Sequence, residues 1–267
     1  MRLLPEFDKA YLPGISVAPG PYLDRYAQRS ALARRTLPWQ DFSYGPGESE
    51  RLHFFPATAP EAPLLIFVHG GYWQELTEAD SSFAAADVVA HGAAFAALGY
   101  GLAPAHRLDE IVAMVRRGVR WLHRNAQALG ADQRRIVLAG HSAGAQLAAM
   151  CLDAVPVRAA VLLSGLYDLE PLLHSSIGPA IGLTPDEAVR NSPVRLLRPG
   201  MPPLLAARGA GEPAGFAEQQ DLLVAAAREV GVPVDQLVVH GRHHFDLPLA
   251  MADPADPLGR RVLAYLE

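Results

Sequence analysis

The sequence feature that most constrains the fold is an alternation of short apolar runs with amphipathic segments, which begins near residue 63. Runs such as Leu64–Val68, Ile136–Ala139 and Ala159–Leu163 have the length and the continuous apolar character of strands buried on both faces. Between them, Leu108–Leu129 repeats apolar residues at helical spacing. This βαβα rhythm predicts an α/β fold with a mostly parallel central sheet and helices on both faces.

The remaining predicted elements follow the same rhythm. The strands are Asp41–Tyr44 and Arg51–Phe55 as a leading hairpin, then Ala93–Leu98, Leu204–Ala207 and Val234–Val239, and the helices are Ser81–Ala90, Ala143–Leu152 and Phe216–Val230. The proline-rich stretch at about 170–203 is too irregular for a sheet layer, and we expect a cap insertion there that forms a lid or substrate wall. With residues 1–38 as an N-terminal extension packing on the rest, residues 1–267 are predicted to form a single domain.

Composition excludes several classes of protein. Half of the residues are hydrophobic and 19% are charged, which is typical of a folded domain and not of a disordered chain. The formal net charge of −5, without any run of basic residues, argues against nucleic-acid binding. No apolar run approaches the ~20 residues of a membrane span, and Glu6 and Asp8 interrupt the N-terminus where a secretory signal would be apolar. We therefore expect a cytoplasmic protein without membrane or nucleic-acid partners. The lone Cys151 forms no internal disulfide. A homodimer is compatible with the sequence.

The motif Gly140-His141-Ser142-Ala143-Gly144 lies between a predicted strand and a predicted helix of small residues. A G-x-S-x-G motif at a strand-to-helix turn is typical of a nucleophile elbow, where small neighbours make room for a strained serine. The alternative is an ordinary serine in a glycine-rich turn. The strand–turn–helix context favours the elbow and predicts Ser142 as a nucleophile.

A second glycine-rich loop, HGGYW at residues 69–73, directly follows a predicted buried strand. In hydrolases with this arrangement, such a loop supplies backbone N–H groups to an oxyanion hole, and the residue after the nucleophile supplies another. We predict Gly71, Tyr72 and Ala143 as the donors. The alternative is a plain strand-ending turn. It would make the occurrence of both this loop and the G-x-S-x-G turn at the expected places a coincidence.

A catalytic triad in this architecture runs in the order nucleophile, acid, histidine. His244 follows the last predicted strand and is the predicted general base, with His243 as its nearest alternative. The loop after Leu204–Ala207 contains one carboxylate, Glu212, which we predict as the acid. The alternative for Glu212 is a surface residue at a helix N-terminus, favoured there by the helix dipole. Asp221 lies about two helical turns further on and is expected to point elsewhere.

Aromatic residues near these motifs predict the substrate contacts. Tyr72 and Trp73 are predicted to close the acyl side of the site, and Tyr167 and Phe245 to line a slot for an aryl group. Core packing is the alternative for Trp73. The histidines and the single cysteine lack metal-ligand spacing, and no glycine-rich loop of the dinucleotide or P-loop type is present, so we expect neither a metal nor a cofactor.

Together these motifs resemble the α/β-hydrolase superfamily and, within it, the kynurenine formamidase (arylformamidase) group and its esterase-like relatives. The similar segments are HGGYW at 69–73, Ser164–Leu172 (family S-G-x-[FY]-D-L-x-P), Asn191-Ser192-Pro193, the Glu212–Phe216–Gln219 spacing and His244-Phe245. The resemblance runs from about residue 40 to the C-terminus. It departs at two positions, because the family acid is usually Asp and because Gly215 replaces an acidic residue before the phenylalanine.

The resemblance implies a serine hydrolase that cleaves the formamide bond of an N-formyl arylamine such as N-formylkynurenine through an acyl-enzyme. A carboxylesterase for small aryl or alkyl esters is the alternative within the enzymes. A catalytically inactive hydrolase fold used as a binding module is the alternative from another class. The intact set of Ser142, Glu212 and His244 favours an enzyme.

Overall fold

The computed structural model describes residues 5–267, and in this part of the chain eight strands form one sheet. The strands are β1 (Gln40–Ser43), β2 (Arg51–Phe55), β3 (Ala62–Val68), β4 (Ala94–Leu98), β5 (Ala131–His141), β6 (Ala159–Leu163), β7 (Leu204–Gly209) and β8 (Val234–Val239). Their order is β1-β2-β4-β3-β5-β6-β7-β8. The β1/β2 and β2/β4 pairs are antiparallel, and all other pairs are parallel. The expected mostly parallel sheet with a leading hairpin is confirmed.

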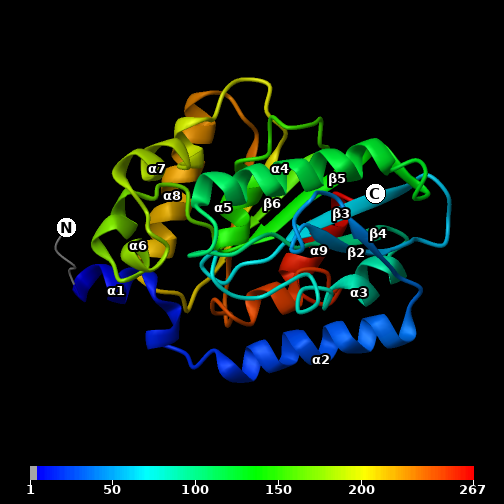
Figure 1. The fold of residues 1–267 in the computed structure, drawn as a ribbon, viewed down its shortest axis with the longest axis horizontal. Coiled ribbons are helices and arrows are strands. Elements are labelled where there is room, and N and C mark those ends of the chain that lie inside the picture. Colours follow the sequence, from blue (N-terminus) through cyan, green and yellow to red (C-terminus); the bar gives the residue numbers. More distant parts are fainter. Residues whose placement is uncertain (1–4) are drawn as a thin grey trace.

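Helices cover both faces of the sheet (Figure 1). On one face lie α4 (Leu108–Asn125), α5 (Ala143–Ala149) and α8 (Ala214–Glu229), and on the other lie α3 (Ala85–Ala90) and α9 (Pro257–Ala264), with α2 (Gly20–Thr36) outside them. The shorter elements are α1 (Pro5–Tyr11), α6 (Ile177–Ala180), α7 (Pro185–Arg190) and four 3₁₀ turns at Pro13–Ile15, Glu170–His174, Pro193–Arg195 and Leu247–Ala250. Four of these elements, at 170–174, 177–180, 185–190 and 193–195, lie within the irregular 170–203 stretch, which adds no strand to the sheet.

Strand β3 shows why its sequence is apolar without interruption. Leu64, Ile66 and Val68 pack into the core on one face of the sheet, whereas Leu65 and Phe67 pack into the core on the other. Successive side chains of a strand point to opposite faces, so a strand with helices on both sides needs an apolar residue at every position. The uninterrupted apolar run thus indicates that β3 lies in the interior of the sheet with helices on both faces.

Three predicted helices are shorter in the structure: α3, α4 and also α5, which ends at Ala149 and not at Leu152. Helix α3 begins at Ala85 and not near Ser81, because the Ser81 hydroxyl donates to the Thr77 carbonyl and the Ser82 hydroxyl to the Glu78 carbonyl. Such side-chain bonds stabilise turns in competition with a helix. Helix α4 ends at Asn125, after which the chain turns to Gly130.

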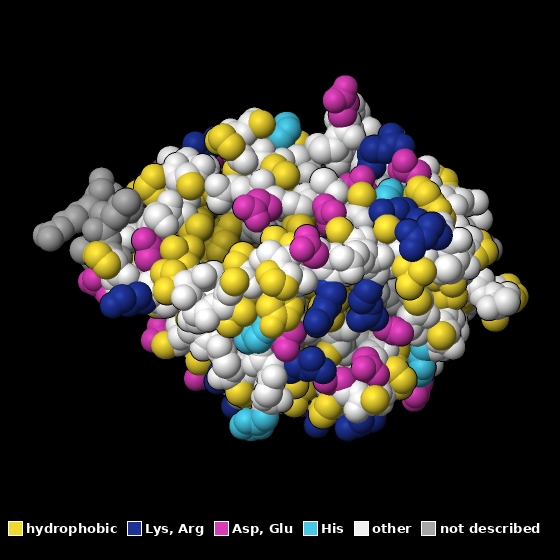
Figure 2. Space-filling model, turned by 90° about the horizontal axis from the view of Figure 1, so that it is seen from below, with side chains coloured by type: hydrophobic (Ala, Val, Ile, Leu, Met, Phe, Trp, Pro, Cys, Tyr) yellow, Lys and Arg dark blue, Asp and Glu magenta, His cyan; other side chains and the backbone are white. Residues whose placement is uncertain are grey.

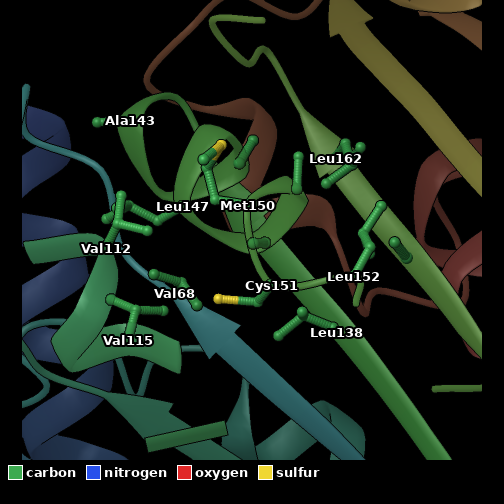
Figure 3. Close-up of a cluster of buried hydrophobic side chains, with 14 of the residues drawn as sticks. Val68, Val112, Val115, Leu138, Ala143, Leu147, Met150, Cys151, Leu152 and Leu162 are labelled. Atoms are coloured by element: carbon green, nitrogen blue, oxygen red, sulfur yellow. The ribbon is translucent and has the colours of Figure 1, made fainter. Parts of the chain in front are cut away.

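Helix α5 is held against the sheet by a buried cluster (Figure 3). Val68, Leu138 and Leu162 from three strands meet Leu147 and Cys151 from the helix and the turn that follows it. Cys151 is fully buried, and burial raises the pKa of its thiol to about 12, as suits a small core residue. This packing fixes the first residue of α5 at the end of β5.

The N-terminal segment lies along the lower edge of the molecule in Figure 1, where α2 runs beside α3. Tyr26 donates from its hydroxyl to the Phe245 carbonyl at 2.5 Å, and Arg29 donates to the Leu249 carbonyl and pairs with Asp87. These contacts join α2 to α3 and to the C-terminal part of the chain. Residues 1–4 of the expected 1–38 extension lie outside the described residues.

On the face shown in Figure 2, basic side chains lie among acidic ones. Each helix within residues 5–267 is too short or too polar to cross a membrane.

Candidate active site

A cavity of about 340 Å³ lies at the carboxyl ends of the central parallel strands. Ligands bind at this edge in open α/β sheets because the chain leaves neighbouring strands in opposite directions there. Four parts of the chain form most of its wall: residues 12–26, the loop after β3, the end of β5 with the turn before α5, and the loop after β8. Most of its surface is apolar.

Ser142 occupies a sharp turn between β5 and α5. Its backbone has φ 56° and ψ −122°, a strained conformation for a residue other than glycine. A Cβ at Gly140 would lie 2.1 Å from the Gly144 carbonyl oxygen, and a Cβ at Gly144 would lie 2.1 Å from that of Val68. The two glycines are therefore required by the close approach of α5, and the turn presents Ser142 to the cavity.

His244 and Glu212 form a buried pair beside this serine. The two atoms His244 Nδ1 and Glu212 Oε2 are 3.1 Å apart, and both side chains are almost inaccessible to solvent. The His244 ring lies between those of His141 and Phe216, with ring centroids 4.6 and 4.5 Å away. Nδ1 is thus directed to the carboxylate, and Nε2 remains for a substrate or for Ser142.

Ser142 and His244 both line the cavity, but no hydrogen bond joins their side chains within residues 5–267. Catalytic hydrogen bonds are often long before substrate binds and tighten in the reacting complex.

Ser164 is a site residue that the sequence did not reveal. Its hydroxyl donates to Glu212 Oε1 at 2.6 Å, and the Gly209 N–H donates to the same oxygen at 2.6 Å. Each oxygen of the Glu212 carboxylate therefore has a partner. Ser164 has φ 49°, another strained position, at the end of β6. The only sequence signal for it is its place at the head of the Ser164–Leu172 segment.

The alternatives for the acid and the base lie elsewhere. Asp221 is exposed on α8 and accepts a hydrogen bond from Gln236. His243 packs edge-on against Tyr22, and its Nδ1 accepts from the Phe245 N–H.

The three predicted oxyanion donors lie around the serine. Gly71 has φ 92° and its carbonyl accepts from the N–H groups of Gln74 and Glu75, which makes a tight turn. Gly71, Tyr72 and Ser142 all line the cavity. In the described part of the chain, the N–H groups of Gly71, Tyr72 and Ala143 donate to no protein acceptor. Free N–H groups beside a nucleophile can stabilise an oxyanion.

Two of the four predicted substrate contacts, Trp73 and Tyr167, do not line the cavity. Trp73 is fully buried in the hydrophobic core and donates from Nε1 to Gln146 Oε1. Tyr167 is 1% exposed and its ring packs over Gly165. Tyr72 and Phe245 do line the cavity.

The N-terminal segment supplies more of the wall than expected. Leu12, Ile15, Leu23 and Tyr26 line the cavity, whereas the 170–203 stretch contributes Ile177 alone. The signal in the sequence is an uncharged stretch from residue 10 to residue 23. Such a stretch is expected to pack against the rest of the fold, but its sequence does not indicate against which part.

No three His, Cys, Asp or Glu side chains within residues 5–267 are grouped as metal ligands.

Comparison with known proteins identifies the fold. Residues 52–155 match the family model BD-FAE. A candidate thioesterase from Silicibacter sp. is 29% identical, with a TM-score of 0.86 over 98% of both chains. The chain has the α/β-hydrolase fold.

Among curated proteins, this α/β-hydrolase resembles arylformamidases and esterases. It is 38% identical to the kynurenine formamidase of Danio rerio over 180 residues, 64% of the chain. It is 28% identical to Esterase LipQ of Mycobacterium tuberculosis over 262 residues, 86% of the chain. The matches span 59% and 60% of those two relatives.

Proposed function

We propose that this protein is a serine hydrolase that cleaves the formamide bond of an N-formyl arylamine, such as N-formylkynurenine. The observation that carries the proposal is the buried His244–Glu212 pair on the wall of the cavity that Ser142 also lines. The resemblance to a kynurenine formamidase supports the choice of a formamide.

In the first half of the reaction, the Ser142 hydroxyl oxygen attacks the formyl carbon and its proton passes to His244 Nε2. The N–H groups of Gly71, Tyr72 and Ala143 donate to the oxyanion of the tetrahedral intermediate. When the intermediate collapses, the C–N bond breaks and His244 returns the proton to the nitrogen. The arylamine leaves, and a formyl ester remains on Ser142.

In the second half, a water molecule gives a proton to His244 and its oxygen attacks the formyl ester. Collapse of this intermediate breaks the bond to Ser142 Oγ, which regains the proton, and formate leaves. The Glu212 carboxylate fixes the His244 ring through Nδ1 and stabilises the imidazolium that forms in each half.

The residues of the cavity wall favour a substrate with a small acyl group and an apolar leaving group. Tyr72 is part of the oxyanion loop, and its hydroxyl donates to the Tyr11 carbonyl, so the ring is held in place. Leu12, Ile15 and Leu23 offer apolar surface for an aryl ring. A small pocket discriminates sterically among acyl groups.

A carboxylesterase is the second candidate, favoured by the similarity to Esterase LipQ along most of the chain. The same groups would cleave an ester, with an alcohol in place of the arylamine. A catalytically inactive binding protein is the third, and covalent labelling of Ser142 by a fluorophosphonate would contradict it.

Steady-state kinetics on substrates that differ in the acyl group and in the bond cleaved distinguish a formamidase from an esterase. The panel contains the N-formyl, N-acetyl and N-butyryl anilides, the corresponding esters and a thioester, together with N-formylkynurenine. We expect kcat/KM to fall steeply from formyl to acetyl to butyryl, and Ser142→Ala to lose turnover by about a million-fold. A preference for butyryl esters with no cleavage of N-formylkynurenine would replace the formamidase by an esterase.

A further inference from the structure

The oxyanion loop is held by a buried tyrosine to which the proposed reaction gives no role. The hydroxyl of Tyr100, in the loop after β4, lies 2.8 Å from the His69 carbonyl oxygen and 3.2 Å from that of Gly70, and shares its hydrogen between them. Tyr100 is 3% exposed, and its ring stacks on that of His69 with 4.1 Å between the centroids. Burial raises the pKa of Tyr100 well above its usual range, so the phenol keeps its proton and remains a donor.

A second side chain holds the Gly70 carbonyl. His69 Nδ1 lies 3.0 Å from the same oxygen. Since a carbonyl oxygen can only accept, Nδ1 carries the hydrogen of this bond. The Gly70 carbonyl therefore accepts hydrogen bonds from two buried side chains that stack on each other.

The Gly70 carbonyl and the Gly71 N–H belong to one rigid peptide group. This group is trans, because the one cis bond within residues 5–267 is Ala103–Pro104. In a planar trans peptide the C=O and the N–H point in opposite directions, so fixing the oxygen also fixes the N–H. Two consecutive glycines do not fix this direction by themselves, because glycine adopts a wide range of backbone angles.

This peptide group begins beside the nucleophile. A Cβ at Gly70 would lie 3.1 Å from Ser142 Cβ, and Gly71 lines the same cavity as Ser142. A rotation of the peptide group would therefore turn the Gly71 N–H away from an oxyanion that forms at Ser142. Oxyanion stabilisation is effective because the donors are oriented before the charge develops.

We propose that Tyr100 is a positioning residue of the oxyanion hole, whose hydroxyl holds the Gly70–Gly71 peptide group so that the Gly71 N–H points to the oxyanion. The inference rests on the proposed function, because it requires an oxyanion at Ser142, and it applies to a formamide and to an ester alike. The benefit arises in the transition state and not in substrate binding, because the negative charge develops only there.

The test compares formanilide with thioformanilide, in which sulfur replaces the carbonyl oxygen. Sulfur is a weak hydrogen-bond acceptor, so the thioformanilide depends less on the oxyanion N–H groups. The intrinsic difference in reactivity between the two substrates cancels when their rate ratio is compared among variants.

The variant is Tyr100→Phe, which removes the hydroxyl and keeps the ring that stacks on His69. Tyr44→Phe is the matched control, because Tyr44 is also buried and its hydroxyl also donates to a backbone carbonyl, that of Gly99. Labelling to completion with a fluorophosphonate counts the intact sites in each variant.

We expect Tyr100→Phe to lower kcat for formanilide about tenfold, the effect of weakening one oxyanion hydrogen bond, and to change KM less than about twofold. The ratio of kcat/KM for formanilide to that for thioformanilide should fall at least about fivefold. In Tyr44→Phe, kcat and this ratio should change less than about twofold, although its melting temperature falls as well.

Should Tyr100→Phe fail to fold, His69→Leu and His69→Asn decide, because Asn keeps an N–H donor near the position of Nδ1 and Leu has none. The ratio should then fall in His69→Leu and stay within about threefold of the wild-type value in His69→Asn.

An unchanged ratio in a Tyr100→Phe protein that labels fully, or an equal fall in Tyr44→Phe, would overturn the inference alone. A wild-type protein that cleaves neither formanilide nor phenyl formate would overturn the proposed function and the inference with it. If the wild type cleaves phenyl formate and not formanilide, the choice of a formamide fails, and the same comparison on phenyl formate and O-phenyl thioformate decides the inference.

Discussion

At the scale of single residues, the acid of the proposed triad is defined by its contacts. Glu212 Oε2 faces His244 Nδ1, while Ser164 and the Gly209 N–H hold Oε1. These bonds give the longer Glu side chain a fixed place where related enzymes usually have Asp.

We expect Glu212→Gln to lower kcat about 10³- to 10⁴-fold, because an amide cannot stabilise the imidazolium and can favour the wrong tautomer of His244. Asp221→Asn, at an exposed carboxylate on α8, is the control and should change kcat less than about twofold. Kinetics on formanilide measure both. A larger loss for Asp221→Asn would mean that the acid is misassigned.

A second residue-scale prediction concerns pH. His69 is 1% exposed at the end of β3 and stacks on Tyr100, and burial lowers its pKa to about 4. Because an unfolded histidine titrates near 6.5, the unfolded chain binds the extra proton first, and the free energy of unfolding falls as pH drops from about 6.5 to 4. One histidine contributes a slope of at most about 1.4 kcal/mol per pH unit, which vanishes below the folded-state pKa.

Urea unfolding of the wild type and of His69→Phe between pH 4 and 7 isolates this slope, because the other buried histidines contribute to both proteins. The variant should lose stability less steeply as pH falls. Parallel curves would show that His69 does not carry the expected proton linkage.

At the scale of elements, the site depends on how closely α5 approaches the end of β3. A Cβ at Gly144 would lie 2.1 Å from the Val68 carbonyl oxygen and 2.3 Å from that of His69. The backbone would have to move, and with it both the elbow and the oxyanion loop.

Gly144→Ala should therefore lower the free energy of unfolding by about 1–3 kcal/mol and reduce fluorophosphonate labelling of Ser142. Gly20→Ala at the start of α2 has open space around the new Cβ and is the matched control. Thermal unfolding and active-site titration measure the two effects. Wild-type values for Gly144→Ala would contradict the close approach of α5.

At the scale of the whole molecule, the cavity is completed by a segment more than a hundred residues away from the serine in sequence. Leu23 on α2 lines the cavity, while Leu32 on the same helix is 50% exposed. The two leucines allow the wall to be tested without changing the helix itself.

We expect Leu23→Ala to enlarge the cavity and to raise kcat/KM for bulky substrates relative to small ones, measured on butyryl against formyl esters and on naphthyl against phenyl leaving groups. Leu32→Ala should leave both ratios unchanged. If neither ratio changes in Leu23→Ala, α2 is not a wall of the binding site.

The sequence by itself determined the sheet and the positions of the reactive motifs. Local chemistry suffices for these features, because a strand covered on both faces must be apolar throughout and a tight strand-to-helix turn must contain glycines. Ser142, Glu212 and His244 could thus be placed after their strands, and the carboxyl ends of parallel strands necessarily share one edge of the sheet.

The tertiary structure alone decided the surroundings of that site. Distant residues decide the wall from residues 12–26, the Ser164–Glu212 bond and the burial of Trp73. The bond from Tyr26 to Phe245 joins residues 219 positions apart. Periodicity and motifs depend on residues close together in the sequence. The contact partner of a side chain depends on how the whole chain packs.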